Sequence, residues 1–214
     1  MKSLPNKTSI LLAIILFIGM PIFFYATGGF PRRTLLKETI SLLTIVSLCL
    51  VLTQFFLTRS GNSLLLRHNM AKVIKVHKII GYVFLCIFLV HPFLIVLPRY
   101  FEAGAEPLDS LITILSTYNN VGVLNGIFAW CLMLTLLSTA LLRKRMPLTY
   151  KNWTAVHKWL SIAFIIFACW HAIDLGRHTN GGLSAYVVVL TLCGIFLPIK
   201  DHIVQIALKS RISH

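Results

Sequence analysis

The sequence predicts an all-α integral membrane protein, a six-transmembrane-helix bundle with both termini in the cytoplasm. Three observations predict this fold: 57% of the residues are hydrophobic and 12% charged, six apolar runs are long, and Lys and Arg are distributed unevenly between the loops. A soluble domain of ordinary composition is about 25% charged. A helix needs about 20 apolar residues to span a bilayer. Because six such runs and their short connections occupy the whole chain, we expect one transmembrane domain over residues 1–214.

The apolar runs place the spans near residues 9–25, 35–57, 75–97, 121–142, 156–175 and 183–199. The first run follows Lys2 and Lys7, as the core of a cleaved signal peptide would. No A-x-A-like cleavage site follows it, so we expect it to remain as a span. Pro21 near its end predicts a kink, which membrane helices tolerate. The other five follow from length and apolarity, and only the third and fifth contain histidine.

The charged residues indicate which way the spans run. Fifteen of the twenty Lys and Arg lie on the side that also holds both termini, whereas the other side holds five of them and five of the six acids. The positive-inside rule places the richer side in the cytoplasm. The formal net charge of +14 is therefore a topology signal, which anionic lipid headgroups reinforce, and does not indicate nucleic-acid binding. We expect a multi-pass plasma membrane protein, in bacteria an inner membrane protein.

Several common sites are excluded by their missing motifs. All five cysteines lie within spans, and neither C-x-x-C nor C-x-x-C-H occurs, so no zinc ribbon, thioredoxin-like pair or c-type haem attachment is supported. Neither G-x-G-x-x-G nor a P-loop occurs, so the chain has no recognisable nucleotide site.

Histidines recur with one spacing in the third and fifth spans. "VHKIIGYVFLCIFLVH" contains His77 and His91, and "VHKWLSIAFIIFACWH" contains His157 and His171. In a helix, 14 residues fall only about 40° short of four turns, so the two rings of a span share a face about 21 Å apart along the axis. Both spans are odd-numbered and therefore parallel. This puts His77 level with His157, and His91 level with His171.

Two histidines at each of two depths favour a planar iron macrocycle over other sites. A buried imidazole is costly in hydrocarbon, and ligation of iron from each helix removes that cost. A zinc or copper site needs three or four ligands at one depth. Hydrogen-bonded core histidines, or the path of a haem-free metal or proton transporter, are the alternatives. Iron with two axial histidines has no open position, so the expected chemistry is one-electron transfer from the cytoplasm to the outer face.

Some neighbouring side chains have both a functional and a structural interpretation. Lys78 and Lys158 follow the inner histidines and could pair with haem propionates, or snorkel to the boundary. Arg177 and His178 could meet the outer propionates or an anionic chelate, or be solvated loop residues. Three tryptophans could pack on porphyrin or simply mark the membrane boundary: Trp153, Trp159 and Trp170.

Six spans with H-x13-H on the third and fifth resemble the ferric reductase-like transmembrane domain, the membrane core of ferric-chelate reductases and NADPH oxidases. "HKIIG" is similar to the His-basic-x-x-Gly opening of that family, whereas "HKWLS" has Ser161 in place of the glycine. The resemblance implies two stacked b-type haems. His77 and His157 would hold the inner haem iron, and His91 and His171 the outer one.

The chain departs from the larger members of that family after its sixth span. Those reductases carry a cytoplasmic flavin- and nicotinamide-binding domain, whereas 15 residues follow Ile199 here. We therefore expect a stand-alone form, the membrane component of an oxidoreductase that needs a separate donor. The donor would be a cytoplasmic flavoprotein reductase with FMN or FAD, or quinol. The acceptor would be a ferric chelate, oxygen or a redox protein outside. The alternative is a haem-binding anchor subunit that passes electrons from quinol or a flavoprotein to a periplasmic redox enzyme, as the membrane subunit of a methionine sulfoxide reductase does.

Overall fold

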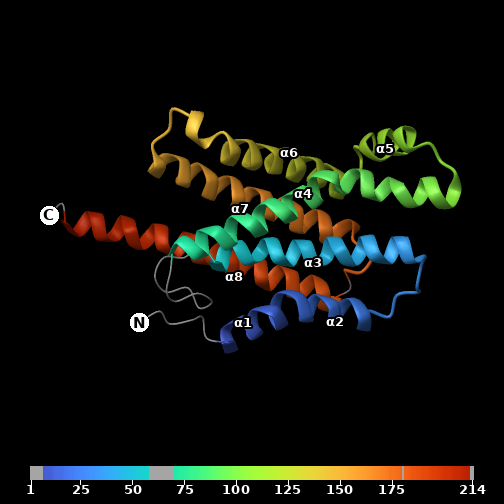
Figure 1. The fold of residues 1–214 in the computed structure, drawn as a ribbon, viewed down its shortest axis with the longest axis horizontal. Coiled ribbons are helices and arrows are strands. Elements are labelled where there is room, and N and C mark those ends of the chain that lie inside the picture. The colour runs from blue at the N-terminus through green and yellow to red at the C-terminus, as the bar shows by residue number, and fades with distance from the viewer. Residues whose placement is uncertain (1–6, 58–69, 180, 213–214) are drawn as a thin grey trace.

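A computed structural model describes residues 7–57, 70–179 and 181–212, and the regular structure in these ranges is entirely helical (Figure 1). Five of its elements form the first three spans and a surface helix: α1 (Lys7–Ile14), α2 (Met20–Thr27), α3 (Leu35–Leu57), α4 (Met70–Ala103) and α5 (Pro107–Leu115). Three more α-helices complete the bundle: α6 (Val121–Leu141), α7 (Tyr150–Leu175) and α8 (Gly181–Ile212).

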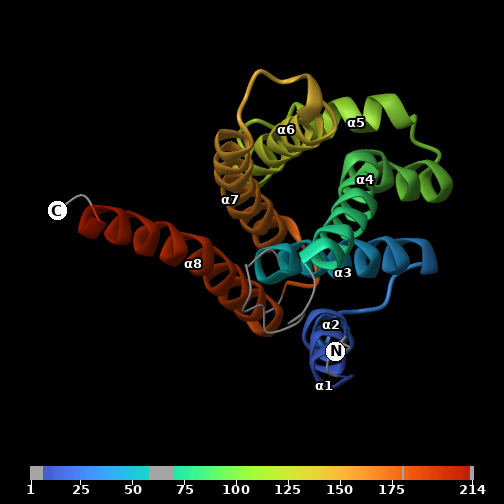
Figure 2. The same ribbon diagram turned by 60° about the vertical axis from the view of Figure 1, so that its left-hand side comes forward.

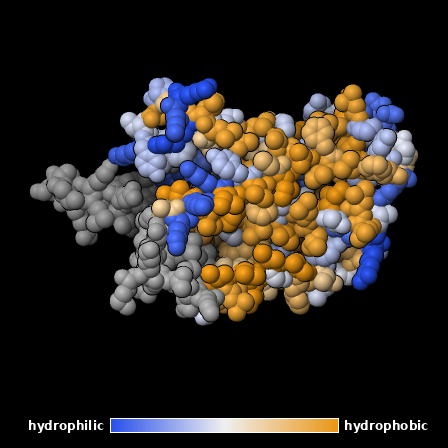
Figure 3. All heavy atoms as spheres, viewed as in Figure 1, coloured by the Kyte–Doolittle hydropathy of each residue, from blue (hydrophilic) through white to orange (hydrophobic). Residues whose placement is uncertain are grey.

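The prediction of six membrane-spanning helices is confirmed. Six helical segments are long and apolar enough to cross a bilayer: residues 10–27, 35–57, 71–103, 121–141, 150–175 and 181–200. Figure 3 shows apolar side chains gathered across the middle of one face of the molecule, with hydrophilic side chains toward both ends. The fifth helix begins six residues earlier than expected because Thr149 caps it, its hydroxyl accepting a hydrogen bond from the Asn152 amide. Hydrophobicity alone does not register such a cap.

The first span is interrupted by a π-helical turn, η1 (Ile15–Gly19), directly before Pro21. The Met20 amide donates to the Ile15 carbonyl, one residue further back than in an α-helix. Proline has no amide hydrogen to donate, so a local change of hydrogen-bond register accommodates it. The expected irregularity is therefore present, and it takes the form of a wider turn on the N-terminal side of the proline.

The sequence prediction missed α5, which is nine residues long and therefore too short to register as a span. Pro107 occupies its first turn, where the missing amide hydrogen costs nothing. Its chain neighbours are the end of α4 and the start of α6, and it packs against both helices. Figure 2 shows it beside α6, away from α8.

The bundle has two chemically distinct ends. Helix α7 begins at one end, after the short 3-10 turn η2 (Arg143–Arg145), and we call this the basic end. The opposite end, which holds Glu38, Glu102 and Asp174, is the acidic end. Helix α7 packs against α6 and α8, whereas α4 packs against α3, α5 and α6. Helices α4 and α7 stand on opposite sides of the bundle's middle, between α6 and α3 (Figure 2). They share α6 as a neighbour, whereas their other partners differ.

Candidate functional site

The structure brings the four histidines of α4 and α7 together as two pairs. The ring centres of His77 and His157 are 6.3 Å apart with 72° between the ring planes. Those of His91 and His171 are also 6.3 Å apart, with 86° between the planes. Both pairs form only if the two helices are parallel and in register. At the helical rise, the pairs lie about 21 Å apart along the bundle.

A separation of 6.3 Å is too long for a hydrogen bond between the rings and fits a metal ion between them. A metal–imidazole bond is about 2.0 Å, and the ring nitrogen is about 1.1 Å from the ring centre, so rings on opposite sides of one ion have centres about 6.3 Å apart. Within the described ranges, no three His, Cys, Asp or Glu residues cluster closely enough to hold a metal ion. Each pair thus offers two imidazoles at a spacing that suits one metal ion between them, which is the donor set that a haem held by two histidines requires.

The Nδ1 atoms of the four rings have different surroundings. Nδ1 of His77, His91 and His157 is buried, and no described residue is its hydrogen-bond partner. Such atoms are costly in an apolar interior. His171 differs, because its Nδ1 lies 2.8 Å from the carbonyl oxygen of Gly122. A carbonyl only accepts, so Nδ1 carries the proton and Nε2 keeps its lone pair for a metal.

Helix α6 positions His171 by close approach. A Cβ atom added to Gly126 would lie 2.5 Å from His171 Nδ1 and 2.7 Å from Cε1. A Cβ on Gly122 would overlap the side chains of Asp174 and Leu175. One turn further along α6, Trp130 donates from Nε1 to the Leu89 carbonyl of α4 at 3.3 Å. The two glycines therefore let α6 reach the imidazole, and Trp130 ties the same helix to α4.

At the basic end, an aromatic side chain stacks on the His157 ring. The Trp153 indole stacks on the imidazole with 5.1 Å between centres and 24° between planes. Its Nε1 donates to the Thr139 carbonyl of α6 at 3.1 Å, which fixes its orientation. Of the three tryptophans that the sequence singled out, Trp153 contacts a histidine ring, whereas Trp159 and Trp170 are 48% and 56% exposed. The last two occupy positions typical of a lipid-facing surface.

The side chains that the sequence suggested as partners of haem propionates have other surroundings in the structure. The Lys158 ammonium lies 5.1 Å above the Trp159 ring, and Lys78 is exposed. Arg177 donates to the Pro31 carbonyl at 3.2 Å. The interpretation of His178 as a solvated loop residue is wrong, because it is 5% exposed.

His178 belongs to a polar cluster that joins the loop before α3 to the loop after α7. Its Nε2 lies 3.2 Å from a carboxylate oxygen of Glu38 and 3.3 Å from Arg33. Glu38 also accepts hydrogen bonds from the Tyr25 hydroxyl and from Arg33. Sequence spacing gave no sign of this cluster, because its members come from three separate segments.

We expect the acidic end to lose stability as pH falls. Burial lowers the pKa of His178, although the Glu38 carboxylate opposes this, so the folded protein resists protonation there. A histidine whose pKa is depressed on folding contributes stability above its ordinary pKa of about 6.5 and loses it at lower pH. The thermal midpoint should therefore fall between pH 7 and pH 5. His178→Gln, which does not titrate, should show a smaller fall, and equal falls in both proteins would contradict this role.

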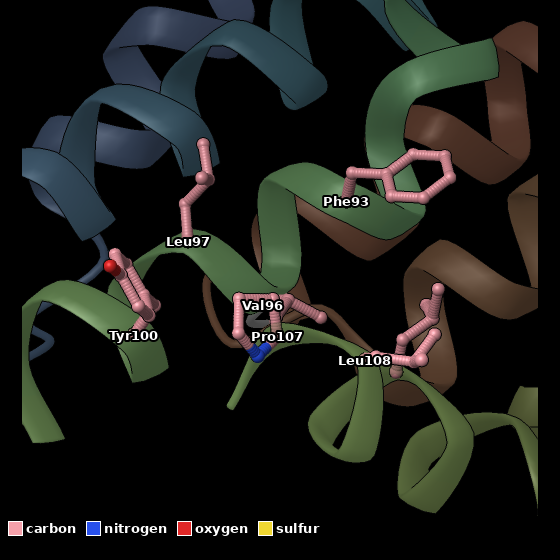
Figure 4. Close-up of a pocket in the computed structure, with 7 residues that line it drawn as sticks. Phe93, Val96, Leu97, Tyr100, Pro107 and Leu108 are labelled. Atoms are coloured by element: carbon pink, nitrogen blue, oxygen red, sulfur yellow. The ribbon is translucent and has the colours of Figure 1, made fainter. Parts of the chain in front are cut away.

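A separate apolar pocket of about 310 Å³ lies at the acidic end between α4 and α5 (Figure 4). Phe93, Val96, Tyr100 and Pro107 are among its lining residues. Phe93 is about 200° around the helix from His91, so the pocket opens on the other side of α4 from the histidine pair. Its lining is almost wholly apolar and includes no histidine or carboxylate. It is therefore not part of the paired-histidine site.

Comparison with known proteins adds three findings. A family model described as "Ferric reductase like transmembrane component" matches residues 43–169, a range that includes His77, His91 and His157 and ends two residues before His171. An uncharacterized protein of Archaeoglobus fulgidus is 35% identical over 161 residues, which cover 75% of this chain and 87% of that protein. No solved structure matches the chain.

Proposed function

Because this chain belongs to the ferric reductase like transmembrane component family, we propose that it carries electrons across a membrane through two b-type haems, each held by one histidine pair. Family membership indicates transmembrane electron transfer in general. The number, position and ligands of the haems are our proposal. His77 and His157 would hold the haem at the basic end, and His91 and His171 the one at the acidic end.

The observation that carries this proposal is the equal separation of the two pairs. Both are 6.3 Å between ring centres, although different residues surround them. A proton path would bring its histidines within hydrogen-bonding reach of one another or of water, at about 2.7–3.2 Å between heavy atoms. The repeated separation instead supports two equivalent axial sites, one above the other.

The protein's own residues would hold the haems and restrict their chemistry. Haem iron supplies a one-electron carrier at each level. Because both histidines of a pair would be engaged in holding one haem, they would leave no place at its metal for oxygen or substrate and would confine the chemistry to electron transfer. Gly122 would hold the His171 ring in the tautomer that leaves Nε2 free. Midway along the two spans, buried Phe164 belongs to the apolar core and partly buried Phe84 packs against that core.

We propose that electrons run from the basic end to the acidic end. The uneven distribution of Lys and Arg supports a cytoplasmic basic end in a plasma membrane. The donor would be a flavoprotein with FMN or FAD, or quinol. The acceptor outside would be a ferric chelate, oxygen or a redox protein. Residues 1–214 would work as one transmembrane unit in this process.

A reduced-minus-oxidised optical spectrum of the purified protein, combined with haem quantification, tests the proposal. We expect the spectrum of low-spin b-type haem, with about two haems per chain. Low-spin iron follows from two axial histidines, so a high-spin spectrum would contradict the ligand assignment. A fully loaded preparation without haem would refute the function, and one haem per chain would mean that only one pair is used.

A further inference from the structure

A cation and two aromatic rings form a column that ends on His157. The Arg143 guanidinium carbon lies 4.7 Å from the centre of the Tyr150 ring and 5.1 Å from that of Trp153. The two rings are stacked, 6.2 Å apart with 24° between planes. Trp153 in turn lies on His157 at 5.1 Å. The guanidinium therefore contacts both rings, and Trp153 links it to the imidazole.

Arg143 has no anionic partner among the side chains that the structure describes. Across the ranges that the structure describes, no carboxylate lies within ion-pair distance of it, and its Nε is buried without a hydrogen-bond partner. Five of the six acids of the sequence belong to the acidic end. Stacking on aromatic faces is a favourable environment for a guanidinium that is partly removed from water.

We infer that Arg143 and Trp153 are positioning residues for the basic-end haem: Trp153 sets the ring plane of His157, and Arg143 raises the reduction potential at that site. This inference rests on the proposed function, because it concerns the haem that His77 and His157 would hold. The step concerned is the uptake of one electron from a reduced flavin or quinol, with both axial histidines still bound. No bond to iron forms or breaks in it.

The electrostatic part follows from the charge change at the iron. Reduction removes one positive charge, so a nearby fixed cation stabilises the reduced form relative to the oxidised form. A half-buried cation acts through a lower effective dielectric than one in water. The guanidinium carbon lies 5.1 Å from the Trp153 ring centre, which lies 5.1 Å from that of His157. A metal that His157 holds would lie about 3 Å further on, so its distance from the charge would be at most about 13 Å. At that distance an effective dielectric of about 20 gives close to a tenfold effect on the reduction equilibrium. The arginine therefore favours electron uptake at the end where we propose that the donor docks.

The orienting part follows from the indole's own hydrogen bond. Because Trp153 is tied to the Thr139 carbonyl, it cannot follow a rotation of the imidazole and instead opposes it. We therefore expect Trp153 to fix the His157 side of the 72° angle between the His77 and His157 rings. The angle between axial imidazole planes governs the magnetic anisotropy of low-spin ferric haem, so electron paramagnetic resonance reports it.

A redox titration of Arg143→Gln tests the charge. We expect the equilibrium constant for reduction of one haem to fall by up to about tenfold, which is about 59 mV for a one-electron couple, with the other haem unchanged. Arg145→Gln is the matched control: it removes the same charge from the same turn, but Arg145 is exposed and more strongly screened. Arg143→Lys, which keeps the charge, should retain most of the potential. His171→Ala should keep only the basic-end haem. The reduction potential measured in that variant therefore shows which of the two wild-type potentials belongs to the basic end.

Electron paramagnetic resonance of oxidised Trp153→Ala tests the orientation. One of two low-spin signals should change its anisotropy, and Trp153→Phe, which restores a stacking ring, should largely recover it. Trp159→Phe on the same helix should leave both signals unchanged. If Trp153→Ala does not retain haem, Trp153→Phe decides by itself. It keeps a stacking ring but loses the indole hydrogen bond, so its signal should have the anisotropy of wild type and be broader.

The outcomes separate this inference from the function on which it rests. Wild-type protein without haem would refute the proposed function. Two haems with equal shifts in Arg143→Gln and Arg145→Gln, or unchanged signals in both Trp153 variants, would refute the inference and leave the function standing.

Discussion

Replacing His171 with alanine is expected to lower the haem content of the purified protein from about two to about one per chain. The iron at the acidic end would lose one of its two axial bonds, and the half-buried His91 ring alone would hold the haem weakly. His91→Ala should give the same loss. Haem quantification by the pyridine haemochrome method, with the optical spectrum of the remaining haem, measures the effect.

Double variants make the pairing itself testable. If His91 and His171 serve one haem, replacing both should cost no more haem than replacing either, because residues that act on one site are not additive. His77→Ala combined with His171→Ala should remove both haems. Trp170→Ala, at an exposed position next to His171, is the control and should keep both. An additional loss in the His91 and His171 double variant would contradict the pairing.

The same variants test the direction of the bundle. In right-side-out vesicles, a membrane-impermeant oxidant should react first with the acidic-end haem if the basic end is cytoplasmic. His171→Ala should remove that fast phase, whereas His77→Ala should preserve it. The opposite result would invert the orientation and leave the ligand assignment intact.

Adding one methyl group at Gly126 is expected to have an effect nearly as large. The new Cβ would stand 2.5 Å from His171 Nδ1, closer than any ordinary contact, so the imidazole would be displaced and its bond to the Gly122 carbonyl strained. Overpacking of this kind costs about 1–3 kcal/mol. This corresponds to roughly 5- to 150-fold weaker haem binding at the acidic end. Haem transfer from Gly126→Ala to excess apomyoglobin measures the loss.

Gly181→Ala is the matched control for Gly126→Ala. No atom lies within 4 Å of the position that its Cβ would take, so haem retention should match wild type. The basic-end haem should also be unaffected in Gly126→Ala, because its ligands lie about 21 Å away along the bundle. Loss of both haems would show that the substitution destabilises the whole bundle and does not act through His171.

Much of this protein was predictable from local pattern. Apolar length alone located six spans, because a bilayer imposes a minimum length that loops do not reach. The level pairing of His77 with His157, and of His91 with His171, followed from two facts of helix geometry. Fourteen residues nearly complete four turns, and spans of equal parity run in the same direction.

The tertiary structure alone decided which helix faces meet. A membrane helix that is apolar on every side has no amphipathic stripe to show its rotation, so the sequence could not tell whether the histidines of α4 and α7 face each other. Their separation of 6.3 Å, the approach of Gly126 to His171 and the column on His157 are all outcomes of helix packing. The burial of His178 depends on loops far apart in the chain. Periodicity records spacing along one helix, whereas these contacts depend on how separate helices are placed against one another.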